Sequence, residues 1–305
     1  MALGCNCDMG LSNTGQPNCV TLQSVTSRII QVPLVANDGT LNRITLATAI
    51  TNSTFTALVN QIDPSKRWYP SPAFENVELP KADTQFEEAN SGRKAFLRQG
   101  IRSFAGELWA SNGTPQFLGK LQSDRCVKFG IYIVDVNGNL IGSKSDDGLY
   151  LSPITIDNNS WDPKFMFATD TTVGKIMLGF DFDRLFDEST MWMITPTEGL
   201  IDFNTLTGLM DVNFNVPTQV SGVSVTYKAF LSYGTAINPI KFVGGVSADF
   251  VITNLTTGVV TVGTTTESTI TSGTYTTLAT FVVGNKYRIR VVKTGFTGDL
   301  LFTAI

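Results

Sequence analysis

The chain has 305 residues, of which 42% are hydrophobic and only 16% are charged, and its formal net charge is −4. This length predicts two domains, and the charged fraction, below the roughly 25% of a typical soluble domain, suggests that part of the surface is hidden against other subunits. The sequence contains no histidine, which removes the commonest general base, the commonest zinc ligand and every serine–histidine or cysteine–histidine nucleophile pair. An enzyme is therefore not expected, and the acidic balance argues against a nucleic-acid-binding protein, which normally carries a basic excess.

The first nineteen residues, MALGCNCDMGLSNTGQPNC, hold Cys5, Cys7 and Cys19. Leu3-Gly4-Cys5 has the outline of a lipoprotein cleavage site, but a signal needs a basic start and roughly 7–15 apolar residues before that point. Later apolar runs also fall short of the roughly 18 residues of a membrane span. We therefore expect a soluble chain without an export signal, whose cysteine-rich lead is reduced and packed at a subunit interface.

A hairpin and a short helix are expected next. SRIIQVPLV and LNRITLA flank the turn-forming residues 37–39, which predicts a hairpin. In residues 51–64, TNSTFTALVNQIDP, apolar side chains recur at i, i+3, i+4 and i+7 from Phe55. This spacing predicts an amphipathic helix with one buried face, capped by Asn52 or Ser53 and ended by Asp63-Pro64.

Residues 66–96, KRWYPSPAFENVELPKADTQFEEANSGRKAF, combine prolines, aromatics and charges without a clean period. Such a stretch predicts an extended arm or loop, because long irregular segments are usually functional or buried against a partner. We expect the arm, from Trp68 to Lys94, to order against a neighbouring subunit, since it has no periodicity with which to bury its aromatics within one chain. The alternative is a loop folded back on its own domain. The expected interface residues are Trp68, Tyr69, Phe74 and Phe86.

The following segments are predicted to be strands. AFLRQGIRSFAGELWA favours two strands broken at Gly100, and CVKFGIYIVDVNGNLIGSK favours a hairpin with a type I′ turn at Asn137-Gly138. Further strands are expected in LYLSPITID, KFMFATD and KIMLGFDFD, with a short helix or turn at RLFDEST before MWMITP.

Composition changes after Pro217. Thirteen of the thirty residues from Val251 to Thr280 are threonine, and from Thr218 onward six Lys/Arg face three Asp/Glu, against sixteen and twenty-three before it. Short strand-like segments recur through this tail, for example KYRIRVVK, in which apolar and charged side chains alternate. Such spacing predicts an immunoglobulin-like (Ig-like) sandwich, here without cysteine and hence without the disulfide of antibody domains.

The cysteines leave three possibilities open. A tetrahedral zinc site can be made of four thiolates, and the chain has four cysteines, Cys5, Cys7, Cys19 and Cys126. Their spacing, C-x-C-x11-C with a distant fourth cysteine, departs from the usual C-x2-C pairs of zinc sites. A disulfide is disfavoured in a protein made in the cytoplasm. Free thiols are the favoured interpretation, so we predict no metal and no cofactor.

Two other patterns share some features of functional sites. Asp135, Asn137 and Asn139 have the spacing of a calcium loop, but the glycine falls at the fourth position and no glutamate follows at the twelfth, so a hairpin turn explains them. A glycosidase would need two carboxylates facing one cleft, and nothing else marks a pocket near the grouped acidic residues. These groups are Glu87-Glu88, Asp146-Asp147, and Asp181, Asp183, Asp187 and Glu188.

Several stretches together carry a resemblance: CNCDMGLSNTGQPNC, SRIIQVPLVANDGTLN, FTALVNQIDPSKRWYP, EEANSGRKAFLRQGIRSFAGEL and FLGKLQSDRCVKFGIYIVDVNGNLIG, followed by the Ig-like end. As a set they resemble virion structural proteins of tailed bacteriophages that infect Bacteroides-type hosts, especially tail tube or tail ring components, including those of crAss-like phages. The resemblance covers most of the chain. It implies a β-sandwich or small-barrel ring subunit with a flanking helix, arms that hook neighbours and often an Ig-like domain.

The expected protein is thus mainly β, with a tail-tube-like assembly domain over residues 1–217 and an Ig-like β-sandwich over residues 218–305. Its expected function is to self-assemble, without catalysis, into rings or a tube of a phage tail through which DNA passes. The expected partners are copies of itself, other tail or portal-proximal proteins and genomic DNA bound without sequence specificity, in a virion assembled in the host cytoplasm and without membrane contact. The alternatives are a head decoration protein or host-binding adhesin with an Ig-like domain and, less favoured, a carboxylate-based glycan-cleaving tail enzyme.

Overall fold

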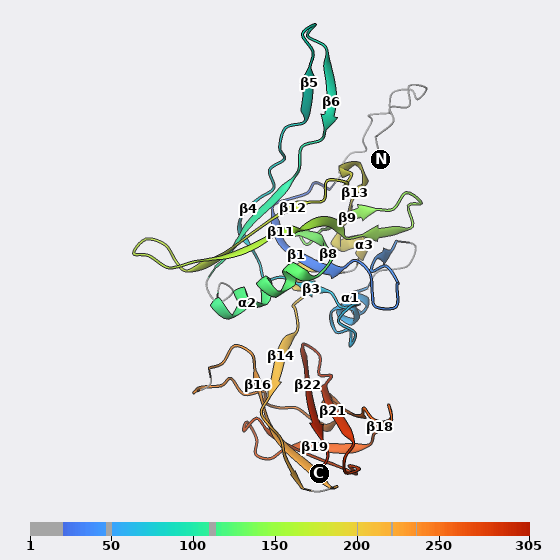
Figure 1. Ribbon diagram of the computed structural model, residues 1–305, viewed down its shortest axis with the longest axis vertical. Helices are drawn as coiled ribbons and strands as arrows, with labels where there is room; N and C mark the ends of the chain where they lie inside the picture. The colour runs from blue at the N-terminus through green and yellow to red at the C-terminus, as the bar shows by residue number, and fades with distance from the viewer. Residues whose placement is uncertain (1–20, 47–50, 110–113, 200, 221, 236) are drawn as a thin grey trace. The chain divides into compact units, whose positions relative to one another are not determined.

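The computed structural model describes residues 21–46, 51–109, 114–199, 201–220, 222–235 and 237–305. It is mainly β, as the sequence predicts, with sheets that form a nearly closed barrel and a short helix. The chain divides into two compact units, Met1–Leu58 with Asp63–Leu206, and Val59–Ile62 with Thr207–Ile305 (Figure 1). The boundary expected after Pro217 therefore falls earlier, because strand β14 (Met210–Phe214) already belongs to the second unit.

An eleven-stranded sheet forms the body of the first unit. Its main path runs β2-β10-β9-β8-β11-β12-β7-β4, while β1 pairs with β8 and β3, and β13 pairs with β9. The strands are β1 Thr26–Pro33, β2 Ile44–Thr45, β3 Tyr69–Pro70, β4 Glu75–Glu78, β7 Ser103–Leu108, β8 Phe129–Asp135, β9 Leu140–Lys144, β10 Tyr150–Ser152, β11 Ile154–Met166, β12 Lys175–Phe182 and β13 Met191–Ile194. The helices are α1 Asn52–Val59, α2 Pro115–Ser123 and α3 Pro196–Gly199, with 3-10 turns η2 Asp124–Cys126, η3 Glu188–Thr190 and η4 Phe203–Thr205.

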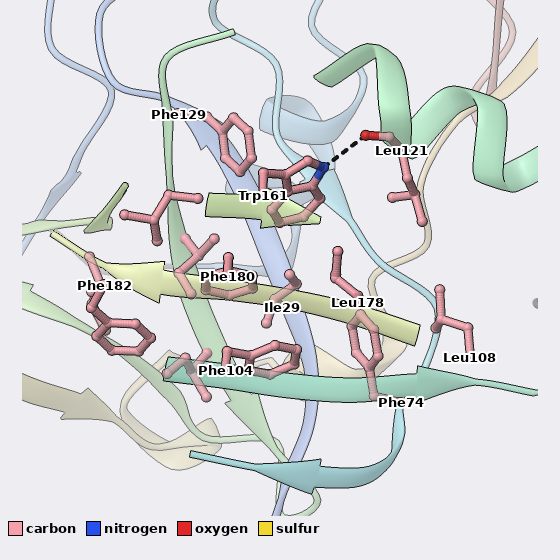
Figure 2. Close-up of a cluster of buried hydrophobic side chains, with 14 of the residues drawn as sticks. Ile29, Phe74, Phe104, Leu108, Leu121, Phe129, Trp161, Leu178, Phe180 and Phe182 are labelled. Carbon is pink, nitrogen blue, oxygen red and sulfur yellow. Dashed lines mark hydrogen bonds between the residues drawn. The ribbon is translucent and has the colours of Figure 1, made fainter. Parts of the chain in front are cut away.

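Strand β8 lies at the centre of this unit, and all seven of its residues are buried. On one face lies an aromatic and aliphatic cluster in which Trp161 packs against Phe129 and Phe180, with ring centroids 5.0 and 5.4 Å away (Figure 2). The Trp161 indole Nε1 donates a hydrogen bond to the Leu121 carbonyl at 2.8 Å. This bond satisfies the one polar group of the buried ring and fixes α2 beside the sheet.

The opposite face of β8 is covered by α1 and by the chain that follows it. Tyr132 of β8 stacks on Trp68 at 4.9 Å, and Phe55 of α1 meets Trp68 edge-on at 5.5 Å. The Tyr132 hydroxyl donates to the Leu151 carbonyl at 2.8 Å. The predicted helix is confirmed in its position, with Phe55 and Val59 buried as expected. Its predicted end at Asp63-Pro64 is wrong, because the helix ends at Val59 and Ile62 beyond it is exposed. The predicted cap is also wrong, since the Thr51 hydroxyl accepts from the Thr54 N–H at the start of the helix.

Three turns share one geometry, in which five residues carry glycine at the fourth position. In residues 36–40, 89–93 and 135–139 the first N–H donates to the fifth carbonyl and the glycine N–H donates to the first carbonyl. The glycines have φ of +83°, +78° and +78°, which glycine adopts without steric cost. Since only Gly138 takes a positive φ in the β8–β9 turn, the expected hairpin forms with a type I turn and a left-handed glycine, so the predicted type I′ turn is wrong.

The turn at residues 37–39 does not join two paired strands, contrary to the prediction. Beyond the single bridge between Val35 and Leu41, β1 pairs with β8 and β3, and β2 pairs with β10. The reason is burial: residues 29, 30 and 32 of β1 are fully buried, so this strand is stabilised more in the middle of the sheet than at a hairpin edge.

The second unit has the strand order of an immunoglobulin fold. One sheet runs β14-β16-β20-β19 and the other β18-β17-β21-β22, which matches the ABED and C′CFG sheets of that fold. Strand β14 joins both, because Met210 and Asp211 pair in parallel with β22 while residues 212–214 pair with β16. The remaining strands are β15 Thr218–Val220, β16 Ser224–Leu231, β17 Phe250–Asn254, β18 Val260–Thr261, β19 Gly263–Glu267, β20 Thr274–Ala279, β21 Lys286–Val291 and β22 Phe296–Thr303, with the 3-10 turn η5 Ser247–Asp249.

A buried tyrosine supports the same assignment. Tyr287 stands near the start of β21, and its hydroxyl accepts a hydrogen bond from the Val282 N–H at 2.9 Å and from Asn254 Nδ2 at 3.2 Å. This is the tyrosine corner of Ig-like domains, in which a tyrosine of the sixth strand bonds back to the preceding corner. The predicted Ig-like sandwich is therefore confirmed.

Candidate functional site

Residues 75–108 form one long two-stranded ribbon that starts in the sheet and ends free of it. At its root β4 pairs with β7, and β7 pairs along six residues with β12. The two segments of the ribbon then continue through a β-bridge between Lys81 and Arg102 to the hairpin of β5 (Gln85–Glu88) and β6 (Lys94–Arg98). Figure 1 shows this hairpin extending away from the rest of the first unit. We call β5, β6 and their turn the arm tip.

The root of the ribbon is fixed by ionic contacts and by close backbone approach. The Glu188 carboxylate accepts hydrogen bonds from Lys81 Nζ at 2.7 Å and from Arg102 Nε at 2.8 Å. One side chain therefore binds both segments of the ribbon. At Gly100 an added Cβ would stand 1.6 Å from the Ala82 carbonyl oxygen. Only glycine fits at this position, where the two segments of the ribbon approach each other just before the arm tip.

Every residue of β5 and β6 is exposed. Phe86 and Phe96 are cross-strand neighbours whose rings meet edge-on at 6.2 Å, and they are 53% and 58% exposed. Leu97 adds a third apolar side chain, 56% exposed. A two-stranded hairpin with no core behind it is marginally stable in water, so this apolar group is costly unless something covers it.

The expected interface residues divide between two environments. Phe86 lies on the arm tip, and Tyr69 is partly buried with its hydroxyl donating to the Pro64 carbonyl at 2.9 Å. Trp68 and Phe74 are 2% and 6% exposed inside the first unit. The prediction that the segment cannot bury its aromatics within one chain is therefore wrong for Trp68 and Phe74, because β3 and the backbone bonds that follow it tie residues 69–74 along β1.

A groove of about 620 Å³ opens on the first unit beside β1 and β3. Its walls come from β1 and the loop after it, from the segment before β3, and from η2 with the start of β8. Val35 and Val127 are exposed apolar side chains of its lining, 51% and 46% accessible. The lining residues are Gln31, Pro33, Val35, Asn37, Pro64, Ser65, Tyr69, Asp124, Cys126, Val127, Lys128 and Phe129.

Asp124 is the one carboxylate of this lining. Burial raises the pKa of Asp124 from 3.8 to about 6, while the neighbouring Gln31 amide opposes the rise. Within the described residues it forms no ion pair. A half-buried carboxylate without a cation is a favourable site for a positive group supplied from outside.

The expected metal and thiol features have these outcomes. Cys126 is an exposed free thiol in the groove, whereas Cys5, Cys7 and Cys19 lie outside the described residues. In the part of the chain that the structure describes, no group of three or more metal-ligating side chains comes together. The Asp135 carboxylate accepts hydrogen bonds from the N–H groups of Asn137 and Asn139, so it stabilises the β8–β9 turn in which it lies.

The grouped acidic residues make separate structural contacts. Asp181 accepts from Ser103 Oγ at 2.6 Å, and Asp187 caps the η3 turn through the Ser189 N–H. Glu188 holds the ribbon root, Glu88 lies 3.7 Å from Lys94, and Asp147 accepts from the Leu149 N–H. The grouped carboxylates Glu88, Asp147, Asp181, Asp187 and Glu188 thus each have a structural contact of their own.

Sequence reasoning missed the groove, Phe96 and Leu97, and a second ribbon. The β11–β12 hairpin extends to one side of the sheet (Figure 1) and exposes Phe167 to 78%. Phe96 and Leu97 could have been found from the sequence. In residues 85–98 two short runs that each contain a phenylalanine flank an Asn-Ser-Gly turn, which is the signature of a hairpin. The groove brings residues 31–37, 64–69 and 124–129 together, which no local pattern reveals.

The chain matches no model of a known protein family, and a search of curated proteins finds no significantly similar sequence. Among the described helices, none has the length and apolar character needed to traverse a bilayer.

Proposed function

We propose that this chain is a non-enzymatic structural subunit that self-assembles into rings or a tube of a phage tail through which DNA passes. The observation that carries the proposal is the arm tip, a hairpin with three exposed apolar side chains and no core of its own. An isolated hairpin of this kind gains stability when its apolar face packs against another surface.

Two further observations support a subunit of an assembly. The hydrogen bonds of Lys81 and Arg102 to Glu188 tie the ribbon root to the first unit, which lowers the ordering cost of a docking element. Residues 1–217 carry sixteen basic against twenty-three acidic side chains, and an excess of negative charge on a lumen lets DNA pass without adhering. The resemblance to tail tube and tail ring components specifies the kind of assembly.

The test is the mass and appearance of the purified chain at rising concentration. We expect analytical ultracentrifugation to show a discrete oligomer at micromolar concentration and negative-stain images to show rings or stacked rings. A matched variant that replaces residues 84–99 by two glycines keeps the Lys81–Arg102 bridge and should remain monomeric and folded. A strictly monomeric mass of the intact chain in every buffer would contradict the proposal, and spikes instead of rings would favour the adhesin alternative.

A further inference from the structure

We propose that the arm tip of one copy docks into the groove between β1 and residues 124–129 of a second copy. This inference rests on the proposed self-assembly and identifies the two surfaces that meet. The occupant is a second copy because each chain presents both a projecting apolar group and a hollow that suits it.

The arm tip is separated from the groove of its own copy. Strands β5 and β6 pair only with each other among the described residues. Figure 1 shows them extending away from β1 and β3, which border the groove. With the ribbon root held by Glu188, the tip is presented to another molecule.

The apolar groups of the two surfaces are alike in character. The tip offers the Phe86–Phe96 pair, and the groove offers Val35 and Val127 on its lining. Its volume of about 620 Å³ lies within the roughly 300–1,000 Å³ of pockets that hold a drug-sized ligand. Two phenylalanine rings are smaller than such a ligand, and aromatic side chains that enter a pocket are typical anchors of protein interfaces.

The charges of the two surfaces are also complementary. The groove carries Asp124 and Lys128, and the tip carries Arg93 and Glu87. None of these four side chains forms an ion pair within the described residues. Arg93 can therefore neutralise Asp124, and Glu87 can pair with Lys128, without breaking an ion pair that the described residues of either copy already make.

A tip-to-groove contact joins two different patches of the same chain. Such heterologous contacts leave one tip and one groove open after each addition, and they close into rings when the rotation between copies permits. The inferred contact thus gives the geometry that a ring subunit needs.

The first test is photocrosslinking with the full chain. A photoreactive benzoylphenylalanine replaces Phe96, and equal amounts of ordinary and ¹⁵N-labelled protein are mixed before irradiation, so that links between copies carry mixed isotopes. We expect links from position 96 to peptides that contain residues 31–37, 64–69 or 124–129 of the other copy. The control places the same group at Phe167, another exposed phenylalanine, and should not label those peptides.

The second test exchanges charges on exposed side chains. Glu87→Lys and Lys128→Glu should each weaken assembly about tenfold, since each places like charges together at the contact. The double variant should restore the dissociation constant to within about threefold of the parent chain. Both side chains are exposed, so circular dichroism should show each variant folded.

The outcomes separate the inference from the proposed function. Rings whose links from position 96 map outside the groove, or that form with no such links, overturn the inference and leave the function standing. A double variant no better than the single ones also overturns it. If the intact chain forms no oligomer, the proposed function fails and the inference fails with it.

Discussion

The two ends of the segment from Trp68 to Leu97 carry similar aromatic side chains in opposite environments. Trp68 is 2% exposed, between Tyr132 and Phe55, whereas Phe86 is 53% exposed and its ring contacts that of Phe96. The difference lies in what each end pairs with. The first end lies along β1 in the main sheet, and the second end folds back on its own chain.

This contrast shows that an irregular, aromatic-rich stretch can serve two purposes within thirty residues. Its first part closes the core on one face of β8, and its last part is exposed. The junction is the ribbon root, where Glu188 clamps Lys81 and Arg102. Substitutions in the two parts should therefore have separable effects on folding and on assembly.

The largest expected effect is the loss of the buried end. Trp68→Ala should lower the free energy of unfolding of the first unit by about 3–5 kcal/mol, because the variant leaves a cavity between Tyr132 and Phe55. All four tryptophans lie in that unit, so intrinsic fluorescence during urea denaturation reports its unfolding. Trp192→Ala is the matched control, since Trp192 is 48% exposed and the Lys144 ammonium lies 3.8 Å from the centroid of its ring. A loss below 1 kcal/mol for Trp68→Ala would contradict its place in the core.

Some of this architecture was predictable from local pattern. The Ig-like unit followed from its alternating strands, and the α1 helix followed from the spacing of Phe55 and Val59, because each buries one face that the sequence marks. Helix α2 was missed although Thr114 caps it and Pro115 starts it, a pairing that marks a helix start. The apolar and polar residues of α2 do not form a clear helical period, so the sequence pattern did not indicate a helix there.

The rest depends on contacts between distant segments. Trp68 has no apolar period around it, and its burial requires Tyr132, 64 positions later, on a strand whose two faces are both covered. The site was predictable only in part. An aromatic arm was expected, but the groove joins three separate segments, and the raised pKa of Asp124 arises from burial that only the assembled fold provides.

A smaller loss of stability is expected at the junction. Glu188→Gln should destabilise the first unit by roughly 1 kcal/mol, because a neutral amide replaces a partly exposed carboxylate that accepts from two cations. Hydrogen bonding to Arg102 lowers the pKa of Glu188, so this contribution is present above the ordinary glutamate pKa and disappears as pH falls through the lowered value. Hydrogen exchange of residues 79–103 should accelerate in the variant. Exchange unchanged from the parent chain would show that Glu188 does not fix the arm.

Asp124, which lines the groove, should show a pH dependence of stability opposite in sign to that of Glu188. Because burial raises the pKa of Asp124 to about 6, the folded chain binds this proton more tightly than the unfolded chain, and stability falls as pH rises from about 4 to about 6. Asp124→Asn should therefore melt at a higher temperature than the parent at pH 7, with the difference vanishing near pH 4.

The same variant should assemble more weakly, since it removes the proposed partner of Arg93. Asp170→Asn, at an exposed carboxylate, is the control, and a lower melting temperature for Asp124→Asn at pH 7 would refute the assignment.

The smallest effect on folding is expected at the exposed end, where the double variant Phe86→Ser, Phe96→Ser should change the free energy of unfolding by less than about 0.5 kcal/mol. Both rings are more than half exposed and contact each other instead of a core, so their removal leaves no cavity in the first unit. Assembly should nevertheless fall by at least tenfold in dissociation constant, because anchors that fill a pocket dominate an interface. Phe167→Ser is the matched control for loss of an exposed phenylalanine. Sedimentation velocity combined with fluorescence-detected denaturation separates the two quantities on the same samples. A double variant that unfolds more easily but assembles normally would place the tip in the core of its own unit and remove the contrast with Trp68.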